Sequence, residues 1–509
     1  MKKRKKKIIL HPIMAFLILI LITILASGLL GLLGVSSTYN VVNTIKGDLD
    51  STTVAVQSLF NLSGLKLIFR TTVSNFVNFA PLSMLIITLI GIGIMDKSGF
   101  LQSFFTIVTQ KVSKFRVTLV LSFITILASI MGDISFIIFI PIIALFFKYS
   151  KRNPKAGIIM AFASLTCGMG INIFMNSIDS ALLSYTRLAA NTLDNSYIIS
   201  TYAHFFIMLV MTIIMSIVVA LITEKVTIPK LGKYEDIDEE EFYLDKNKKR
   251  GLFLSTVVGA IYLLIFIYNI IPGLPLSGNL LDYSQQLYID KLFGYNSFFN
   301  QGFVFVITIF FFLCGFFYGI GAKTIKNNRD ICDYLGHSLD GIGKTLVLIF
   351  FASTFISIFK DTNIGNVFLS LAGNLISSWN ITGIPLIIIS FIIIAFLTIF
   401  VPSPVTSWSI LSGVLVPVFM NAGMSAEFAE LVFRAANTVT YGLTPLMAYF
   451  VIYLAFLDKY SEEDKPISLF SSIKDIVPYV STSALIWIIV LIIIYILGIP
   501  IGISTTAII

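Results

Sequence analysis

Nine apolar segments of this sequence are long enough to cross a lipid bilayer as helices. They cover residues 8–34, 76–95, 117–147, 198–223, 251–272, 301–322, 383–401, 439–457 and 478–498. A helix needs about 20 mainly apolar residues to span the hydrocarbon core of a bilayer. Only 12% of the residues are charged, roughly half the fraction found in ordinary globular chains. The sequence therefore predicts an all-α polytopic membrane protein with about nine transmembrane helices.

Other apolar stretches are interrupted by Gly, Pro, Asn or Asp, at residues 156–186, 345–380 and 410–421. Irregular backbone is tolerated at membrane depth only where protein or a water-filled cavity satisfies it. Interruptions at 164–180 and 398–409 lie in different halves of the chain, and such pairs point to a midplane binding site in transporters. We expect two re-entrant hairpins and pseudo-symmetric halves, with Asn363-Ile-Gly365 as another candidate hairpin tip. A break at Gly132-Asp133 is also expected within 117–147.

The domain plan follows from one mixed-charge segment near the middle of the chain. Residues 224–250 are the most polar stretch between apolar runs and are expected to form a cytoplasmic linker. They divide a single membrane transport domain, residues 1–509, into a first half (1–223) and a second half (251–509).

Lys and Arg in the loops predict the orientation of the chain in the cytoplasmic (inner) membrane. The chain begins MKKRKKK, which favours a cytoplasmic N-terminus and an anchor helix over a cleaved signal peptide. Loops 323–344 and 458–474 are basic and are expected inside. Loops 35–75 and 273–300 contain few Lys or Arg and are expected outside.

Several classes of site are not supported by the sequence. Three cysteines and three histidines lack metal-ligand spacing, so no resident cofactor is expected. No nucleotide-binding GxxxxGK[ST] motif occurs, and the histidines lie outside the polar clusters, which disfavours an enzyme. The formal charge of +8 is concentrated at the N-terminus, so it does not indicate nucleic-acid binding.

The first polar cluster within apolar sequence is SLTCGMGINIFMNSIDSALLSY, residues 164–185. Hard cations take oxygen ligands, which freed carbonyls and the Asn172 and Asp179 side chains could supply. These two residues are therefore a candidate sodium site. The alternative is a short loop outside the membrane, where Asp179 is hydrated or pairs with Arg187.

The second cluster is FVPSPVTSW, residues 400–408. Its two prolines predict an unwound stretch rather than a regular helix. Ser403, Thr406 and Ser407 offer oxygens, and Trp408 offers a stacking face. A tryptophan is as often an interfacial belt residue as a ligand platform.

The third cluster is FRAANTVTYGLTPLMAYF, residues 433–450. A guanidinium suits a carboxylate ligand through two parallel hydrogen bonds, whereas the simpler alternative is that Arg434 snorkels to the interface. Asn437 lies one turn later on the same face, and Gly442 and Pro445 are expected to interrupt the helix.

Two further residues are candidates for ion coupling. Thr444 is one of the hydroxyls of the third cluster. Asp133 adjoins an apolar run and could relay protons, although it is equally plausible as a helix-end residue.

At these clusters the sequence resembles the p-aminobenzoyl-glutamate transporter (AbgT) family. NFAPLSMLIITLIGIGIMDKSGF (78–100) is similar to the family's NFxGFAPLG…LGxGVAExSG, and residues 151–185 are similar to its HPLAG…GFSANLL…DPLL. Residues 403–450 parallel its SxSxxWAxxxPxFVPM…YRxxDSVTNxxTPLMxYF. The resemblance implies a homodimer whose protomers each have nine transmembrane helices and two re-entrant hairpins. It carries family site residues onto Asp179, Trp408, Arg434 and Pro445.

Two positions depart from the family pattern. Asn437 stands where the family has an acidic residue, and an asparagine cannot release a proton. Val405 stands where the family has a second serine. Proton coupling through position 437 is therefore in doubt.

The expected function is secondary active transport of a small, carboxylate-bearing, p-aminobenzoyl-glutamate-like substrate, coupled to sodium or protons. An ion-driven exporter of sulfonamide-type antimetabolites is the alternative, and a channel or a membrane-embedded enzyme is less favoured. Expected substrate contacts are Arg434, Trp408, Asn437, Ser403 and Pro445. Expected coupling residues are Asp179, Asn172, Thr444 and Asp133.

Overall fold

The computed structural model describes residues 10–42, 49–110, 112–173, 176–234, 243–286, 288–294, 297–298, 302–461 and 466–508. The basic start MKKRKKK and the centre of the predicted linker, residues 235–242, lie outside these ranges. The N-terminal side of the membrane therefore stays a prediction.

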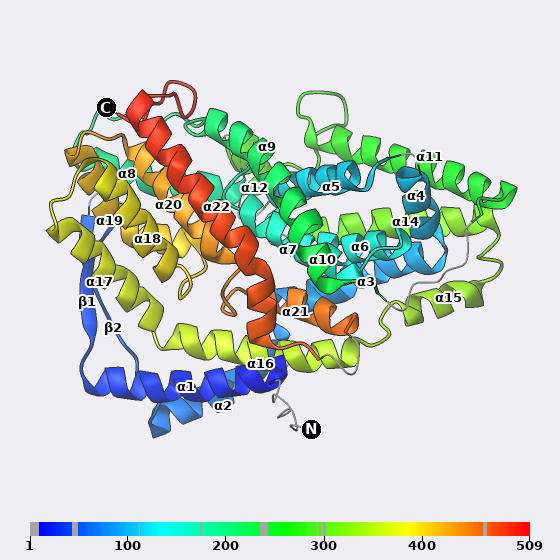
Figure 1. Ribbon diagram of the computed structural model, residues 1–509, viewed down its shortest axis with the longest axis horizontal. Coiled ribbons are helices and arrows are strands. Elements are labelled where there is room, and N and C mark those ends of the chain that lie inside the picture. The colour runs from blue at the N-terminus through cyan, green and yellow to red at the C-terminus, as the bar shows by residue number, and fades with distance from the viewer. Residues whose placement is uncertain are drawn as a thin grey trace, which may run out of the picture.

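Helices make up nearly all the regular structure of the described residues (Figure 1). Before the linker, the helical elements are α1 (Pro12–Leu32), α2 (Leu62–Val77), α3 (Ala80–Lys97), α4 (Phe100–Thr109), α5 (Lys114–Ala128), η1 (Ser129–Met131), α6 (Ile134–Tyr149), α7 (Pro154–Gly168), α8 (Ser177–Asn191), α9 (Phe205–Ile222), η2 (Thr223–Thr227) and α10 (Ile228–Leu231).

Among the described residues, the second half is helical apart from two isolated β-bridges, Met424 to Ile508 and Gly502 to Thr505. Its elements are α11 (Lys246–Ile270), α12 (Tyr288–Phe293), α14 (Phe303–Ala322), α15 (Asn328–His337), α16 (Ile342–Asp361), α17 (Ile364–Ser378), α18 (Gly383–Leu397), α19 (Pro404–Asn421), α20 (Ala426–Tyr441), α21 (Phe450–Lys459) and α22 (Leu469–Leu497). Helices α10 and α11 extend into the predicted linker from both sides, so the linker is narrower than 224–250.

Nine helical segments of the described chain are long and apolar enough to cross a membrane, which agrees with the predicted number. They are residues 12–32, 62–97, 114–131, 205–231, 246–270, 303–322, 342–361, 404–421 and 469–497. The set differs from the predicted one because 342–361 and 404–421 are continuous helices. The predicted span 383–401 contains only the shorter helix α18, and the predicted span 439–457 is divided between α20 and α21.

The predicted chain breaks are confirmed at most positions. Residues 117–147 divide at Gly132 between η1 and α6, and α20 ends just before Gly442. The prediction for 400–408 was too broad, because α19 begins at Pro404 and contains Trp408. Proline is tolerated in the first turn, where its missing N–H has no helical partner. The re-entrant paths and the pseudo-symmetry stay predictions.

One strand pair adds to the all-helical prediction. Strands β1 (Ser36–Val42) and β2 (Leu49–Ala55) pair antiparallel, and the Thr38 and Thr53 hydroxyls lie 2.8 Å apart across them. β-branched residues and alternating polar side chains favour such strands outside a helical bundle.

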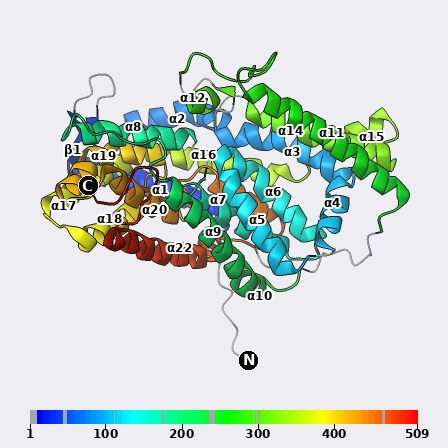
Figure 2. The same cartoon turned by 90° about the horizontal axis from the view of Figure 1, so that it is seen from above.

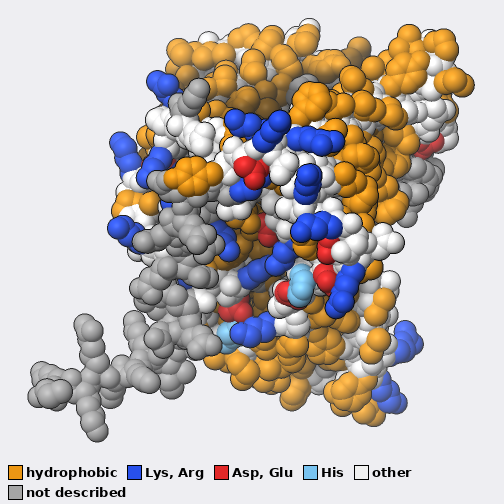
Figure 3. All heavy atoms as spheres, turned by 90° about the vertical axis from the view of Figure 1, so that its right-hand side faces the viewer, with side chains coloured by type: hydrophobic (Ala, Val, Ile, Leu, Met, Phe, Trp, Pro, Cys, Tyr) orange, Lys and Arg blue, Asp and Glu red, His pale blue; other side chains and the backbone are white. Residues whose placement is uncertain are grey.

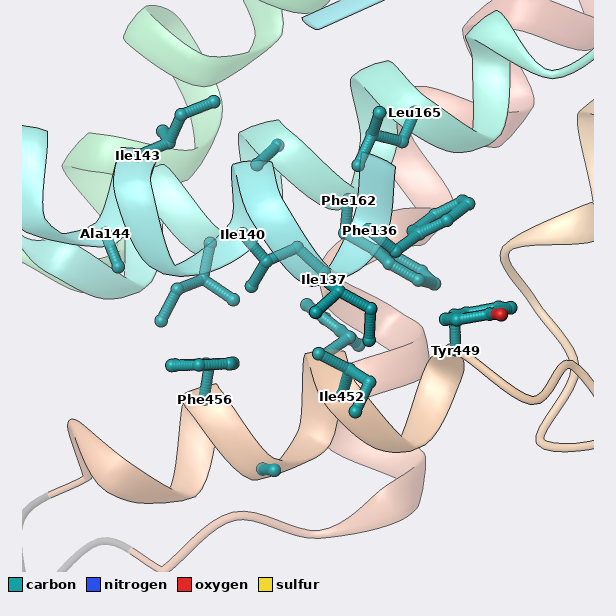
Figure 4. Close-up of a cluster of buried hydrophobic side chains, with 14 of the residues drawn as sticks. Phe136, Ile137, Ile140, Ile143, Ala144, Phe162, Leu165, Tyr449, Ile452 and Phe456 are labelled. Atoms are coloured by element: carbon teal, nitrogen blue, oxygen red, sulfur yellow. The ribbon is translucent and has the colours of Figure 1, made fainter. Parts of the chain in front are cut away.

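An aromatic cluster joins α6, α7 and the start of α21. Figure 4 shows Phe136, Phe162 and Tyr449 converging from these three helices. The Phe136 and Tyr449 rings stack with centroids 5.6 Å apart, and Phe162 stacks on Tyr453 at 4.3 Å. These contacts hold α21 against the first half of the chain, so the two predicted halves share one core.

Lys and Arg side chains gather at one end of the molecule (Figure 3). The strand pair and α15 lie at opposite ends of the long axis (Figure 1), and the view from above keeps them apart (Figure 2). Figure 3 shows Lys and Arg side chains gathered at the α15 end, with apolar surface above and below them. This arrangement agrees with the loop charges that predict the α15 loop inside.

Candidate substrate and coupling site

The α8 helix begins with a capping box that fixes the position of Asp179. The Asn176 side chain accepts hydrogen bonds from the backbone N–H groups of Ile178 and Asp179. Asp179 Oδ2 accepts the backbone N–H of Asn176 in return, at 2.9 Å. This reciprocal arrangement satisfies free donors at a helix start and leaves Asp179 Oδ1 directed away from the cap.

Arg434 reaches that free oxygen from α20, whose residues are all buried. The Arg434 Nη2 to Asp179 Oδ1 distance is 2.5 Å, and the two side chains are each 5% exposed. Arg187, the alternative partner of Asp179, lies exposed on α8. The arginine therefore does not snorkel to an interface, and the aspartate is not a hydrated loop residue.

Glu430, one turn before Arg434, is an acidic residue that the sequence analysis did not single out. Its side chain is fully buried, and Oε2 accepts a 2.6 Å hydrogen bond from the Thr186 hydroxyl. Its Oε1 lies 3.7 Å from Arg434 Nη1 and 3.8 Å from His204 Nδ1. The i,i+4 spacing of Glu430 and Arg434 was the available signal.

His204 and Glu427 complete the buried charged centre and were also missed. His204 Nε2 lies 2.8 Å from the backbone carbonyl of Glu427. Tyr197 donates its hydroxyl to Glu427 Oε2 at 2.7 Å, and burial and this bond raise the pKa of Tyr197. Tyr197 therefore stays a donor, and the Glu427 carboxylate is its acceptor.

A small cavity adjoins the ion pair. Its volume is about 30 Å³, close to the share of one water molecule in the liquid. Asn172, Asp179, His204 and Arg434 line it, with exposed Tyr202 at its edge. The cavity therefore brings together three predicted site residues, although it is far smaller than a typical ligand pocket of roughly 300–1,000 Å³.

Trp408 lies in the same region without reaching this cavity. Its side chain is fully buried, and its ring packs on Phe433 with centroids 4.7 Å apart. Its indole N–H donates to the Thr186 hydroxyl at 2.9 Å. Thr186 thus connects Trp408 to Glu430. A stacking role toward substrate would need a movement that uncovers the ring.

Asn172 lies in the break after α7, as predicted. Its side-chain N–H₂ donates to the Ser129 hydroxyl at 3.0 Å, and Ser129 donates to the Gly168 carbonyl at 2.8 Å. These bonds hold the broken backbone against η1. Asn172 and Asp179 line one cavity, and the sodium role assigned to them stays a prediction.

Three predicted residues follow Arg434 along the chain. Asn437 is buried, and its Nδ2 has no hydrogen-bond partner among the described residues. Thr444 donates to the Ile399 carbonyl at 2.6 Å, which ties the break after α20 to the loop before α19. Pro445 lies within that break, between α20 and α21.

Ser403 and Asp133 lie apart from the ion pair. Ser403 caps α19 and lines a separate cavity of about 270 Å³ with Lys360, Asn363 and Thr406. Asp133 is exposed at the start of α6. The structure therefore groups Asp179, Asn172 and Arg434 closely, with Trp408 behind them, but places Ser403 and Asp133 elsewhere.

Nine candidate spans, together with a buried ion pair where a helix starts after a chain break, define a polytopic membrane protein of the transporter class. The model of the AbgT transporter family matches residues 4–509, and the chain belongs to this family. It is 27% identical over 493 residues to the p-aminobenzoyl-glutamate transport protein of Escherichia coli strain K12. That alignment covers 97% of this chain and 93% of the relative.

Two solved structures are also similar. One is the YdaH transporter of Alcanivorax borkumensis, with 25% identity, a TM-score of 0.49, and coverage of 97% of this chain and 100% of that chain. The other is MtrF of Neisseria gonorrhoeae, whose structure is reported to illuminate a class of antimetabolite efflux pumps. Its identity is 27% and its TM-score 0.49, with 98% of each chain covered.

Proposed function

We propose that this member of the AbgT family is a secondary active transporter of a small carboxylate-bearing substrate of the p-aminobenzoyl-glutamate type. The buried Arg434 guanidinium is the single observation that carries the substrate class. An arginine is costly at membrane depth and marks a substrate or ion pathway there. The relative that transports p-aminobenzoyl-glutamate supports the same choice.

The geometry supports exchange of one carboxylate for another at Arg434. Its Nη2 is engaged by Asp179, whereas Nε has no hydrogen-bond partner among the described residues. A substrate carboxylate could therefore use the remaining N–H groups of the guanidinium fork. The 30 Å³ cavity cannot hold an aryl-glutamate, so binding requires that α8 or the break after α20 move.

Transport in proteoliposomes tests this proposal. Purified protein should accumulate labelled p-aminobenzoyl-glutamate when a sodium or proton gradient is imposed, with the two gradients varied separately. Uptake without dependence on either gradient would indicate a channel. Counterflow of a sulfonamide in the same vesicles tests the exporter alternative.

The homodimer and the inner-membrane location belong to the same proposal.

Variants of Arg434 test the site. Arg434→Lys keeps the positive charge beside Asp179 but loses the planar fork, so we expect uptake to fall at least about tenfold, the equivalent of roughly 1.4 kcal/mol. Arg187→Lys is the matched control because Arg187 is exposed on α8. Equal uptake by Arg434→Lys, Arg187→Lys and the unmodified protein would exclude Arg434 as the carboxylate ligand.

A further inference from the structure

The buried centre around Arg434 contains more carboxylates than cations. Asp179, Glu427 and Glu430 are each at most 4% exposed. Among the described residues, Arg434 is the one Arg or Lys that pairs with any of them. A buried carboxylate without a cation is costly and tends to be neutralised. One of the three is therefore the natural place for an exchangeable proton.

The contacts single out Glu430. Asp179 has its 2.5 Å contact with Arg434 and a backbone N–H bond, and Glu427 receives the Tyr197 hydroxyl. By contrast, Glu430 Oε1 has no hydrogen-bond partner among the described residues. Arg434 Nη1 and His204 Nδ1 lie 3.7 and 3.8 Å from this oxygen, beyond hydrogen-bonding distance.

His204 connects this oxygen to the cavity. Its Nε2 faces the Glu427 carbonyl at 2.8 Å, and a carbonyl can only accept, so Nε2 carries the hydrogen. Its Nδ1 is then bare and faces Glu430 Oε1. His204 also lines the 30 Å³ cavity, which exposed Tyr202 borders. Water in this cavity can reach His204 directly.

We propose that Glu430 and His204 form a proton-carrying pair, an inference that rests on the transport function proposed above. A proton from cavity water binds His204 Nδ1, giving an imidazolium, and then moves to Glu430 Oε1. The imidazole is neutral again, and Glu430 is a neutral acid. Release reverses these steps and returns the proton to water.

Protonation of Glu430 would favour substrate binding. With Glu430 neutral, Arg434 is countered by Asp179 alone, and its Nη1 and Nε N–H groups can donate hydrogen bonds to a second carboxylate. With Glu430 charged, an incoming carboxylate meets an additional negative charge. Proton and anionic substrate therefore bind cooperatively, and each raises the affinity for the other by the same factor. The result is proton–substrate symport.

The other groups around Glu430 do not supply an alternative proton site. Helices α18 and α19 contain no charged residue, and the Thr166 side chain of α7 lies beside Gly442, the residue that follows α20. On α22, Asp475 pairs with Lys230, while Tyr479 lies within hydrogen-bonding distance of the Thr223 and Thr227 hydroxyls. Tyr495 of α22 stacks on Phe428 in the first turn of α20. Among the described residues, the titratable or charged groups linked to Glu430 are Asp179, Tyr197, His204, Glu427 and Arg434.

Infrared difference spectroscopy of the purified protein tests the proton site without substrate. The protein titrated between acidic and alkaline pH should show a protonated-carboxyl band that disappears in Glu430→Gln. Glu427→Gln is the matched control, because it removes a buried carboxylate from the same helix, and it should keep the band. A spectrum that is unchanged in Glu430→Gln, or lost in Glu427→Gln instead, would overturn the proposal.

Proton uptake and substrate affinity test the coupling. Addition of p-aminobenzoyl-glutamate to weakly buffered protein should cause proton uptake, and the Kd should rise up to about tenfold per pH unit as Glu430 loses its proton. Both effects should vanish in Glu430→Gln, while His204→Gln should slow transport without abolishing the pH dependence. Proton release on binding would contradict symport.

The two proposals fail in different ways. A wild-type protein that neither binds nor transports the substrate defeats the proposed function, while the infrared titration still decides the proton site. If substrate uptake depends on pH equally in the wild type and in Glu430→Gln, the proposed proton-carrying pair is wrong, whereas the proposed transport function is still supported.

Discussion

Arg434 is held between two carboxylates that come from different parts of the chain. Asp179 approaches from the first turn of α8, and Glu430 lies one turn earlier on α20. Asn437 lies one turn later on the same face, with its Nδ2 unpaired among the described residues. One face of α20 therefore carries a carboxylate (Glu430), a guanidinium (Arg434) and an amide (Asn437) in succession. The family pattern has an acidic residue after the arginine, whereas this chain has asparagine there and an acidic residue one turn before the arginine.

The charge at position 437 can be tested directly. Asn437→Asp would place a third carboxylate beside Arg434 and compete with the substrate, so we expect the KM to rise about fivefold to tenfold, the equivalent of roughly 1 to 1.4 kcal/mol. Asn437→Ser removes the amide without adding charge and should raise the KM by less than Asn437→Asp does. Uptake kinetics in proteoliposomes would measure both. Identical KM values for the two variants would show that charge is not the cause.

Residue patterns could predict part of this site. Arg434 and Asp179 stood out because charged side chains are rare in apolar sequence. Glu430 was overlooked although it precedes Arg434 by one turn. Its other partners could not be read from the sequence, since Thr186 and His204 lie more than 200 positions away along the chain. Trp408 was predicted to offer a stacking face to the substrate, and only its packing against Phe433 shows that the ring is covered.

Helix ends were predicted better than helix continuity. Gly132, Gly442 and Pro445 mark real interruptions, because glycine and proline act locally on the backbone. Hydropathy predicted a span at 439–457 and none at 342–361. It could not show that 439–457 is divided between two helices. Nor could it show that 342–361, which contains Gly and Lys residues, forms one continuous helix.

A partly buried ion pair joins the turn between α6 and α7 to η2, which directly follows α9. Arg152 pairs with Glu224, and both side chains bond Thr118 on α5. The guanidinium also lies over the Phe147 ring, 4.4 Å from its centroid. Three segments that support the start of α7 are therefore joined at one point.

Removal of Arg152 should destabilise the fold. Arg152→Ala leaves Glu224 partly buried without its cation, so we expect the free energy of unfolding to fall by roughly 2–4 kcal/mol. Arg329→Ala is the matched control, because the Arg329–Asp333 pair is highly exposed. Thermal unfolding in detergent, followed by reaction of the buried Cys167 and Cys314 with a thiol dye, would compare them. Equal melting temperatures would contradict a fastening role.

At the scale of the whole molecule, the end that contains α15 is rich in Lys and Arg (Figure 3) and has a large cavity. A cavity of about 500 Å³ opens there between α16 and α21, lined by Asp340, Lys344, Asp458 and Lys459. Lys and Arg gather at the same end in Figure 3. The positive-inside rule predicts that this end, opposite the strand pair, faces the cytoplasm.

A natural cysteine tests this orientation. Cys332 on α15 is exposed, whereas Cys167 and Cys314 are buried. A membrane-impermeant maleimide should therefore label inside-out vesicles and not right-side-out vesicles. Cys332→Ser should remove the signal, and Ser284→Cys in that background should reverse the sidedness. Labelling of Cys332 in right-side-out vesicles would invert the topology.

Helix α20 carries the charged centre and is buried along its whole length. Because it is enclosed by other helices, lipid chains do not touch the helix that holds Arg434 and Glu430. Bilayer thickness and headgroup charge can then act on the centre only through the surrounding helices. The charged centre therefore has no direct contact with the lipid. Substrate affinity measured in detergent should resemble the affinity measured in lipid nanodiscs.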